Sequence, residues 1–234
     1  MSVFSRMTFS IIIPTYNEAG NIARLVAELR RYAPQAQVLV VDAHSPDGTA
    51  EAARQTGATV LPAPQPGRAT QMNYGAAHAT GEVLYFVHAD VSLHPDFVAT
   101  ITRAVAEGYE AGCYRFQFDS RHPLLRINSY GTRFEGIMSR GGDQTLFITR
   151  GLFGRLGGFN EQFVIMEDFE FIQRIRRVAR FFIAPHAVTV SARKYETNSW
   201  LRVQIANLTA FSLFFLKASP VRIARTYKAM LHTY

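Results

Sequence analysis

The chain has 234 residues, of which 48% are hydrophobic and 18% charged, and its formal net charge is +7. This balance is typical of a folded globular protein and excludes a disordered chain. The excess of positive charge favours anionic partners, such as phosphorylated metabolites or lipid head groups. The basic residues are spread along the chain and form no block of the kind found in nucleic-acid-binding arms, so we expect no nucleic-acid partner.

The single cysteine and the short apolar runs limit where the protein works. Cys113 has no second cysteine to pair with and is predicted to be a small buried residue. The apolar run at residues 11–13 stops at Pro14, which is too short for a signal peptide. No stretch approaches the roughly 20 apolar residues that span a bilayer. We expect a cytoplasmic protein, and attachment to the inner face of the membrane stays open.

Apolar runs alternate with amphipathic segments through residues 1–90. Strands are predicted at residues 9–14, 38–41, 59–61 and 83–87, and buried on both faces. Helices are predicted after Asn17, which could cap the first of them, and at residues 49–55 and 68–79. This alternation predicts an α/β fold, with a mostly parallel central sheet and helices on both faces.

The second half of the chain is less regular. Strands are predicted at residues 114–118 and 144–149, and a helix at residues 167–178. A long apolar helix is predicted at residues 199–217 and another at residues 221–231. The long helix carries one apolar face, formed by Leu201, Ile205, Leu208 and Phe215. We expect one domain at residues 1–195 and a C-terminal helical segment at residues 196–234 that packs on the domain, a partner subunit or a membrane surface.

Polar residues follow three of the predicted strands, at residues 15–18, at Asp42 and at residues 88–90. In parallel sheets, ligands bind beyond the carboxyl ends of the strands. Mg²⁺ and Mn²⁺ prefer oxygen ligands and take one or two protein carboxylates together with phosphate oxygens, which suits Asp90. Asp42 could accept hydrogen bonds from a base or a ribose. Either aspartate could instead cap the following helix, but the two together favour a nucleotide site.

Two further groups could carry chemistry. Arg68 begins a predicted helix, where a guanidinium adds a forked donor to a site that already favours anions, although a solvated surface arginine is the competing interpretation. Glu167 and Asp168 open another helix, where acidic residues are favoured in any case. Adjacent helical residues diverge by about 100°, so only one of the two can act as a general base. The other would be structural or bind substrate.

These motifs, in this order, resemble the family 2 glycosyltransferases. The resemblance spans roughly residues 8–195, and in its details it is most similar to the bacterial subgroup called radical-SAM/selenodomain-associated transferases. The blocks that carry it are Ser10-Ile-Ile-Ile-Pro-Thr-Tyr-Asn-Glu18, Val40-Val-Asp42, Ser45-Pro-Asp-Gly-Thr49, Arg68-Ala-Thr-Gln-Met-Asn-Tyr-Gly75, His88-Ala-Asp90, Gly142-Asp-Gln144, Gly157-Gly-Phe159 and Met166-Glu-Asp168.

The resemblance implies a GT-A fold and a metal-assisted, inverting transfer from a nucleoside-diphosphate sugar. Asp90 would bind Mn²⁺ or Mg²⁺, and Asp168 would be the catalytic base with Glu167 beside it. Gly142 and Asp143 would line the acceptor side. The residues expected to hold the nucleotide-sugar are Pro14, Tyr16, Glu18, Asp42 and Arg68.

Two departures from the family pattern and one missing motif stand out. Ala43 and His44 follow Asp42, where the family often has a second aspartate. His88 replaces the first aspartate of the Asp-x-Asp motif. The Gln-x-x-Arg-Trp motif of processive polysaccharide synthases is absent, and residues 191–195 (Ser-Ala-Arg-Lys-Tyr) occupy a similar place. We therefore expect a non-processive enzyme whose metal site is reduced to Asp90.

The leading hypothesis is a glycosyltransferase with an unidentified acceptor hydroxyl, which a lipid-linked molecule could supply. A nucleotidyltransferase would normally need a glycine-rich loop with a lysine, and residues 14–20 supply only Gly20. A basic anion- or membrane-binding module without catalysis is the other alternative. The interfacial segment of such a module would contain Trp200, Phe211, Phe214 and Phe215 with the basic residues Arg202, Lys217, Arg222, Arg225 and Lys228. Association of the chain with further copies of itself stays open.

Overall fold

The computed structural model describes residues 7–133 and 145–232, which form a seven-stranded sheet with the order β3-β2-β1-β4-β6-β5-β7. Among the described strands, β6 alone runs antiparallel to its neighbours. The strands are β1 (Phe9–Thr15), β2 (Gln37–Asp42), β3 (Thr59–Pro62), β4 (Val83–Phe86), β5 (Ala111–Phe118), β6 (Leu146–Thr149) and β7 (Phe181–Val190).

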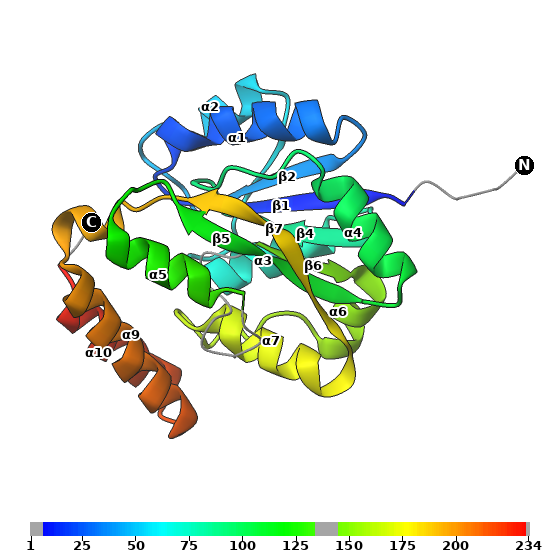
Figure 1. Ribbon diagram of the computed structural model, residues 1–234. Helices are drawn as coiled ribbons and strands as arrows, with labels where there is room; N and C mark the ends of the chain where they lie inside the picture. The colour runs from blue at the N-terminus through cyan, green and yellow to red at the C-terminus, as the bar shows by residue number, and fades with distance from the viewer. Residues whose placement is uncertain (1–6, 134–144, 233–234) are drawn as a thin grey trace, which may run out of the picture.

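Helices cover both faces of this sheet, which confirms the expected α/β fold. In Figure 1, α1 and α2 lie on one face of the sheet, and α6 and α7 lie on the other. The helices are α1 (Ala19–Tyr32), α2 (Thr49–Gln55), α3 (Arg68–Ala77), α4 (Phe97–Ala106), α5 (Pro123–Gly131), α6 (Arg150–Leu156), α7 (Glu167–Val178), α8 (Lys194–Thr197), α9 (Trp200–Phe215) and α10 (Pro220–Met230).

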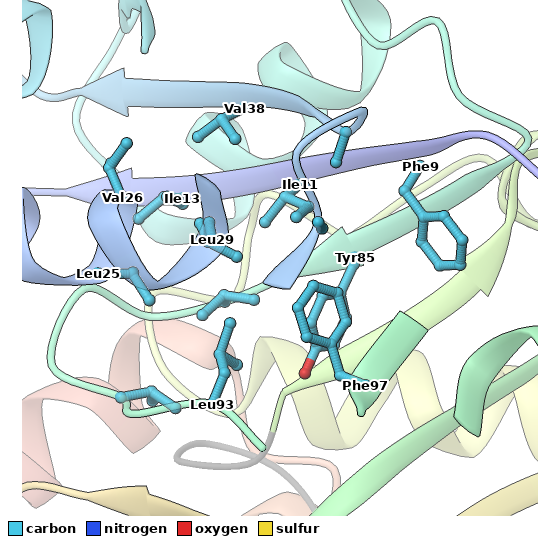
Figure 2. Close-up of a cluster of buried hydrophobic side chains, with 14 of the residues drawn as sticks. Phe9, Ile11, Ile13, Leu25, Val26, Leu29, Val38, Tyr85, Leu93 and Phe97 are labelled. Atoms are coloured by element: carbon cyan, nitrogen blue, oxygen red, sulfur yellow. The ribbon is translucent and has the colours of Figure 1, made fainter. Parts of the chain in front are cut away.

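The central strands are apolar on both sides because each side packs against helices. Successive side chains of a strand point to opposite faces. Ile11 and Ile13 of β1 pack with α1 and α4, and the cluster around them is drawn in Figure 2. Ile12 of the same strand faces the other way, onto a second cluster that includes Met72 of α3 and Phe171 of α7. The strand at residues 59–61 was expected to be buried, but β3 is an edge strand that stays partly exposed.

The start of α1 differs from the sequence prediction. Asn17 is not the N-cap, because it lies outside the helix with a φ of 56°. The N-cap is Glu18, whose side chain makes no capping bond. The loop between β2 and α2 supplies the acceptors instead: the backbone N–H of Ala19 donates to Oδ2 of Asp47 (3.1 Å), and that of Glu18 to Oγ1 of Thr49 (2.8 Å). These contacts satisfy donors that a helix start leaves unpaired.

Five of the described elements after residue 90 were not predicted: α4, α5, α6, α8 and β7. The β7 sequence is interrupted by Pro185, which has no backbone N–H to donate to a neighbouring strand. The pairing of β5 with β7 accordingly shifts register between Tyr114 and Arg115. A strand with such an interruption lacks the regular alternation on which a sequence prediction depends.

The C-terminal helices α9 and α10 pack as a pair at one side of the sheet (Figure 1). The pair contacts the domain through aromatic rings: Phe211 lies against Phe169 with centroids 4.7 Å apart, and Phe214 lies against Phe163 at 5.9 Å. Within the described parts of the chain, no helix is long and apolar enough to cross a membrane.

The buried face of α9 is not the apolar face singled out from the sequence. That face, formed by Leu201, Ile205, Leu208 and Phe215, is open to solvent. A helix that is apolar all round gives no periodicity by which to choose its inner side. The side chains that are buried are Val203, Ala206, Ala210 and Phe211.

Candidate active site

The ends of β1, β2 and β4 meet at one edge of the sheet, as expected for parallel strands. Thr15 lies opposite Asp42, and its Oγ1 donates to Oδ1 of Asp42 over 3.1 Å. Asp42 also accepts from the backbone N–H (2.9 Å) and the hydroxyl (2.6 Å) of Ser45. Its buried carboxylate therefore organises the turn after β2, rather than capping α2. Gln71 of α3 joins this edge by donating to the carbonyls of Thr15 (2.8 Å) and Val41 (2.7 Å).

Arg193, which follows β7, joins two of the predicted site residues. Its Nη2 lies 2.6 Å from Oε1 of Glu18 and 3.3 Å from Oδ2 of Asp90. The structure therefore brings Glu18 and Asp90 together around one guanidinium. Sequence reasoning did not select Arg193; the signal that could have found it is the arginine in the segment at residues 191–195, where processive synthases carry their motif.

Arg68 and Glu167 form a second ion pair, which joins the starts of α3 and α7. Nη1 of Arg68 lies 3.1 Å from Oε1 of Glu167, and the Glu167 side chain is only 1% exposed. Asp168 is buried next to it in the first turn of α7. Two helix N-termini brought close together favour an anion between them. Glu167 thus holds Arg68 at the start of α3.

The loop before α7 is fixed to α3 by Asn73. The Asn73 Oδ1 accepts from the backbone N–H of Phe159 (2.9 Å), and its Nδ2 donates to the Phe159 carbonyl (2.9 Å) and to Oε1 of Glu161 (2.8 Å). Gly158, just before, has a φ of 73°, and a Cβ there would lie 2.6 Å from the Asn73 Oδ1. The motif blocks at residues 68–75 and 157–159 therefore set the position of α3 relative to α7.

The remaining predicted residues differ in how they are placed. Pro14 is enclosed within β1, whereas Tyr16, just past the strand end, is 59% exposed and presents a ring to solvent. Gly142 and Asp143, expected on the acceptor side, lie outside the described residues.

The carboxylates of Glu18 and Asp90 suit a sparse cation site. Mg²⁺ and Mn²⁺ bind through one or two carboxylates when a substrate phosphate supplies further oxygens. Both carboxylates reach the same guanidinium and keep partial exposure, 12% for Glu18 and 24% for Asp90. Within residues 7–133 and 145–232, no three His, Cys, Asp or Glu side chains gather into a larger ligand set. The residues present thus fit a cation held partly by the donor.

Comparison with known proteins identifies the class. The family model described as "Glycosyl transferase family 2" matches residues 10–163. The glycosyltransferase Rv1514c of Mycobacterium tuberculosis is 30% identical over 181 residues, which are 73% of this chain and 69% of that protein. The chain belongs to glycosyl transferase family 2 and is a glycosyltransferase. The nucleotidyltransferase and the module without catalysis are set aside on this ground, and the radical-SAM-associated subgroup stays a prediction.

Solved structures show the same fold. A mannosyltransferase from Pyrobaculum calidifontis, in complex with GDP-Man and Mn²⁺, superposes with a TM-score of 0.67 at 19% identity, over 97% of this chain and 70% of that one. Residues 1–349 of TarS from S. aureus superpose with a TM-score of 0.67 at 17% identity, over 96% of this chain and 70% of that one. The GT-A fold expected from the resemblance is confirmed.

Proposed function

We propose that the protein transfers a sugar from a nucleoside-diphosphate sugar to an acceptor hydroxyl, with a divalent cation and with inversion at the anomeric carbon. The observation that carries this proposal is the meeting of Glu18 and Asp90 around Arg193 at the edge where β1, β2 and β4 end. Positive and negative groups in this place suit a diphosphate together with a cation.

The donor half of the site is assigned as follows. Tyr16 and the turn organised by Asp42 would face the nucleoside, and Arg68 would face the diphosphate at the start of α3. Asp90, with Glu18 beside it, would hold Mn²⁺ or Mg²⁺, which supplies positive charge to the departing diphosphate. The P. calidifontis neighbour was solved with GDP-Man and Mn²⁺, and a TarS structure was solved with UDP-GlcNAc, which supports a donor of this type.

Asp168 is proposed as the general base. It takes the proton of the acceptor hydroxyl while that oxygen bonds to the anomeric carbon and the bond to the diphosphate breaks. Glu167 is engaged by Arg68 at 3.1 Å and so acts as a positioning residue for that arginine. The enzyme is proposed to be non-processive, because the processive synthase motif is missing from residues 191–195.

A thermal-shift panel tests the donor assignment. UDP, GDP, CDP, dTDP and ADP sugars are each added with Mn²⁺ and with a chelator. A ligand at about 100 times its dissociation constant stabilises the fold by roughly 2.7 kcal/mol, or about 5–10 °C for a chain of this size. We expect such a shift with one nucleotide, and only with metal. No shift with any of the five would contradict the proposal, and an equal shift with chelator would remove the cation from it.

A further inference from the structure

An exposed apolar surface runs along α9 and into the turn before α10. We call it the α9 face; its side chains are between 48% and 78% exposed. α9 has 16 residues and is therefore about 24 Å long. A continuous apolar strip of this kind on a protein surface generally marks a site of interaction. The α9 face consists of Leu201, Ile205, Leu208, Phe215, Leu216 and Val221.

The fold does not need these side chains for its own core. Phe211 and Phe214 hold α9 on the domain through Phe169 and Phe163. Of the α9 face, Phe215 packs on both of these anchoring rings and still stays 49% exposed. The hydroxyl of Tyr227 in α10 donates to Oδ1 of Asn207 over 3.0 Å, which fixes the pair. The α9 face is thus presented on a helix that is already anchored.

The segment that carries this face has basic but no acidic side chains. Residues 197–234 contain no aspartate or glutamate, and five of their side chains are arginine or lysine. All five are exposed, so the helix pair that carries the apolar strip also presents positive charge to solvent. They are Arg202, Lys217, Arg222, Arg225 and Lys228.

Helix α5 continues the surface beside α9. A cavity of about 660 Å³ is lined by Leu124 of α5 together with Trp200 and Leu201 of α9, so the two helices border one hollow. Ile127 of α5 is 63% exposed. A second cavity of about 560 Å³, also bordered by α5, is lined by four guanidinium-bearing side chains, those of Arg115, Arg121, Arg126 and Arg133.

Charge decides between a second copy of the chain and a lipid surface as the occupant. A symmetric dimer through the α9 face would bring two sets of five basic side chains together without acidic partners from the same segment. An anionic bilayer offers an apolar layer for the strip and negative head groups for its basic border. We propose that the α9 face binds the surface of membranes that contain anionic lipids. This proposal does not depend on the proposed function.

Vesicle flotation with the protein tests the proposal. We expect the protein to float with vesicles of phosphatidylcholine and phosphatidylglycerol, and not with phosphatidylcholine alone. Ile205→Glu with Leu208→Glu should abolish flotation, because both carboxylates would enter the apolar layer. Each of Arg222→Gln, Arg225→Gln and Lys228→Gln should lower the partition coefficient about fivefold, since a basic residue near such a surface contributes about that factor.

The matched control is Val178→Glu, which changes an exposed apolar side chain of α7 (64% exposed) outside the α9 face and should float as the unaltered protein does. Unfolding midpoints confirm that the variants fold, which is expected because the altered side chains are already exposed. Equal flotation of the double variant would overturn the proposal, as would no flotation of the unaltered protein. So would sedimentation showing a vesicle-free dimer that the double variant loses, because that would assign the face to a second copy.

Discussion

At the scale of single residues, Arg193 and a divalent cation would compete for the same oxygens. The guanidinium bonds to Glu18 at 2.6 Å and to Asp90 at 3.3 Å, in the place proposed for the cation. A cation entering without a nucleotide must first separate Arg193 from both carboxylates. The competition has a measurable consequence in the free protein.

We predict that Arg193→Ala strengthens Mn²⁺ binding to the nucleotide-free protein by about tenfold. A hydrogen bond to a charged group contributes about 1.5–3 kcal/mol, and the variant no longer has to break one. Free Mn²⁺ measured by electron paramagnetic resonance gives the affinity directly. Arg54→Ala is the control, because Arg54 is exposed and pairs with exposed Glu51 on α2. Unchanged or weaker Mn²⁺ binding in Arg193→Ala would show that no such competition exists.

Asp168→Asn tests the general base. Donor turnover, followed as released nucleoside diphosphate, should fall by about 10²- to 10⁴-fold, because the amide cannot take the acceptor proton. The thermal shift produced by donor and Mn²⁺ should stay near that of the unaltered protein. Glu51→Gln, an exposed acidic residue of α2, should leave both quantities unchanged. Normal turnover in a folded Asp168→Asn protein would remove Asp168 from the mechanism.

At the scale of elements, the loop after β2 stabilises two helices at once. Asp47 accepts from the backbone N–H groups of Ala19 at the start of α1 (3.1 Å) and of Thr49 at the start of α2 (3.0 Å). The hydroxyl of Thr49 donates to the same carboxylate and is the main reason that the pKa of Asp47 is lowered from its usual value. The block at residues 45–49, which is part of the resemblance to the family, thus also stabilises the starts of α1 and α2.

We predict that Asp47→Ala lowers the stability of the fold at neutral pH and loses this effect in acid. The carboxylate has a lower pKa in the folded protein than the ordinary value of 3.8. Its contribution is therefore complete above pH 3.8 and disappears as the pH falls through the lower, folded value. Urea midpoints of both proteins against pH measure this. If the difference in urea midpoint between the two proteins stayed constant down to the lowest pH, the charged carboxylate would be excluded as its cause.

Gly75 marks the closest approach of α3 to the sheet. A Cβ at this position would lie 2.5 Å from Cγ2 of Ile12 and 3.0 Å from Cγ2 of Val41. We predict that Gly75→Ala destabilises the fold by about 1–3 kcal/mol through overpacking, measured by chemical denaturation. A Cβ at Gly154 in α6 would have no neighbouring atom within 4 Å, so Gly154→Ala should be neutral or slightly stabilising. Equal changes in stability for Gly75→Ala and Gly154→Ala would show that overpacking is not the cause of the destabilisation.

At the scale of the whole molecule, the C-terminal pair depends on a few aromatic contacts with the domain. Phe211 of α9 is 8% exposed and packs on Phe169, the residue next to Asp168 in α7. The docking of the pair is therefore coupled to the first turn of α7, where the proposed base lies.

We predict that Phe211→Ala releases the pair and lowers stability by about 3 kcal/mol, because a buried aromatic side chain leaves a cavity. Trypsin should then cleave faster at the basic residues of the pair, such as Arg202 and Arg222. Leu208→Ala is the control on the same helix, since Leu208 is 58% exposed and its removal should change neither measurement. If trypsin cleaved α9 and α10 of Phe211→Ala no faster than those of the unaltered protein, other contacts would be shown to hold the pair.

Much of the fold could be predicted because its signals are local. The apolar runs of β1, β2 and β4 and the periodicity of α7 depend on neighbouring residues, and the structure places these elements within one or two residues of their expected bounds. The meeting of the strand ends at one edge follows from parallel pairing alone. The acidic residues at the ends of these strands could be found because each follows a strand that the local sequence predicts.

What the sequence determined by itself was the α/β class, the run of strands and helices in the first half, and a polar site where the strands end. Only the tertiary structure decided that Asp47 caps α1, that Arg193 joins Glu18 to Asp90, and which face of α9 is exposed. Each of these is a contact between segments far apart in the chain, or a choice between two apolar faces. Local periodicity carries no information on either, because both depend on the surface against which a segment packs.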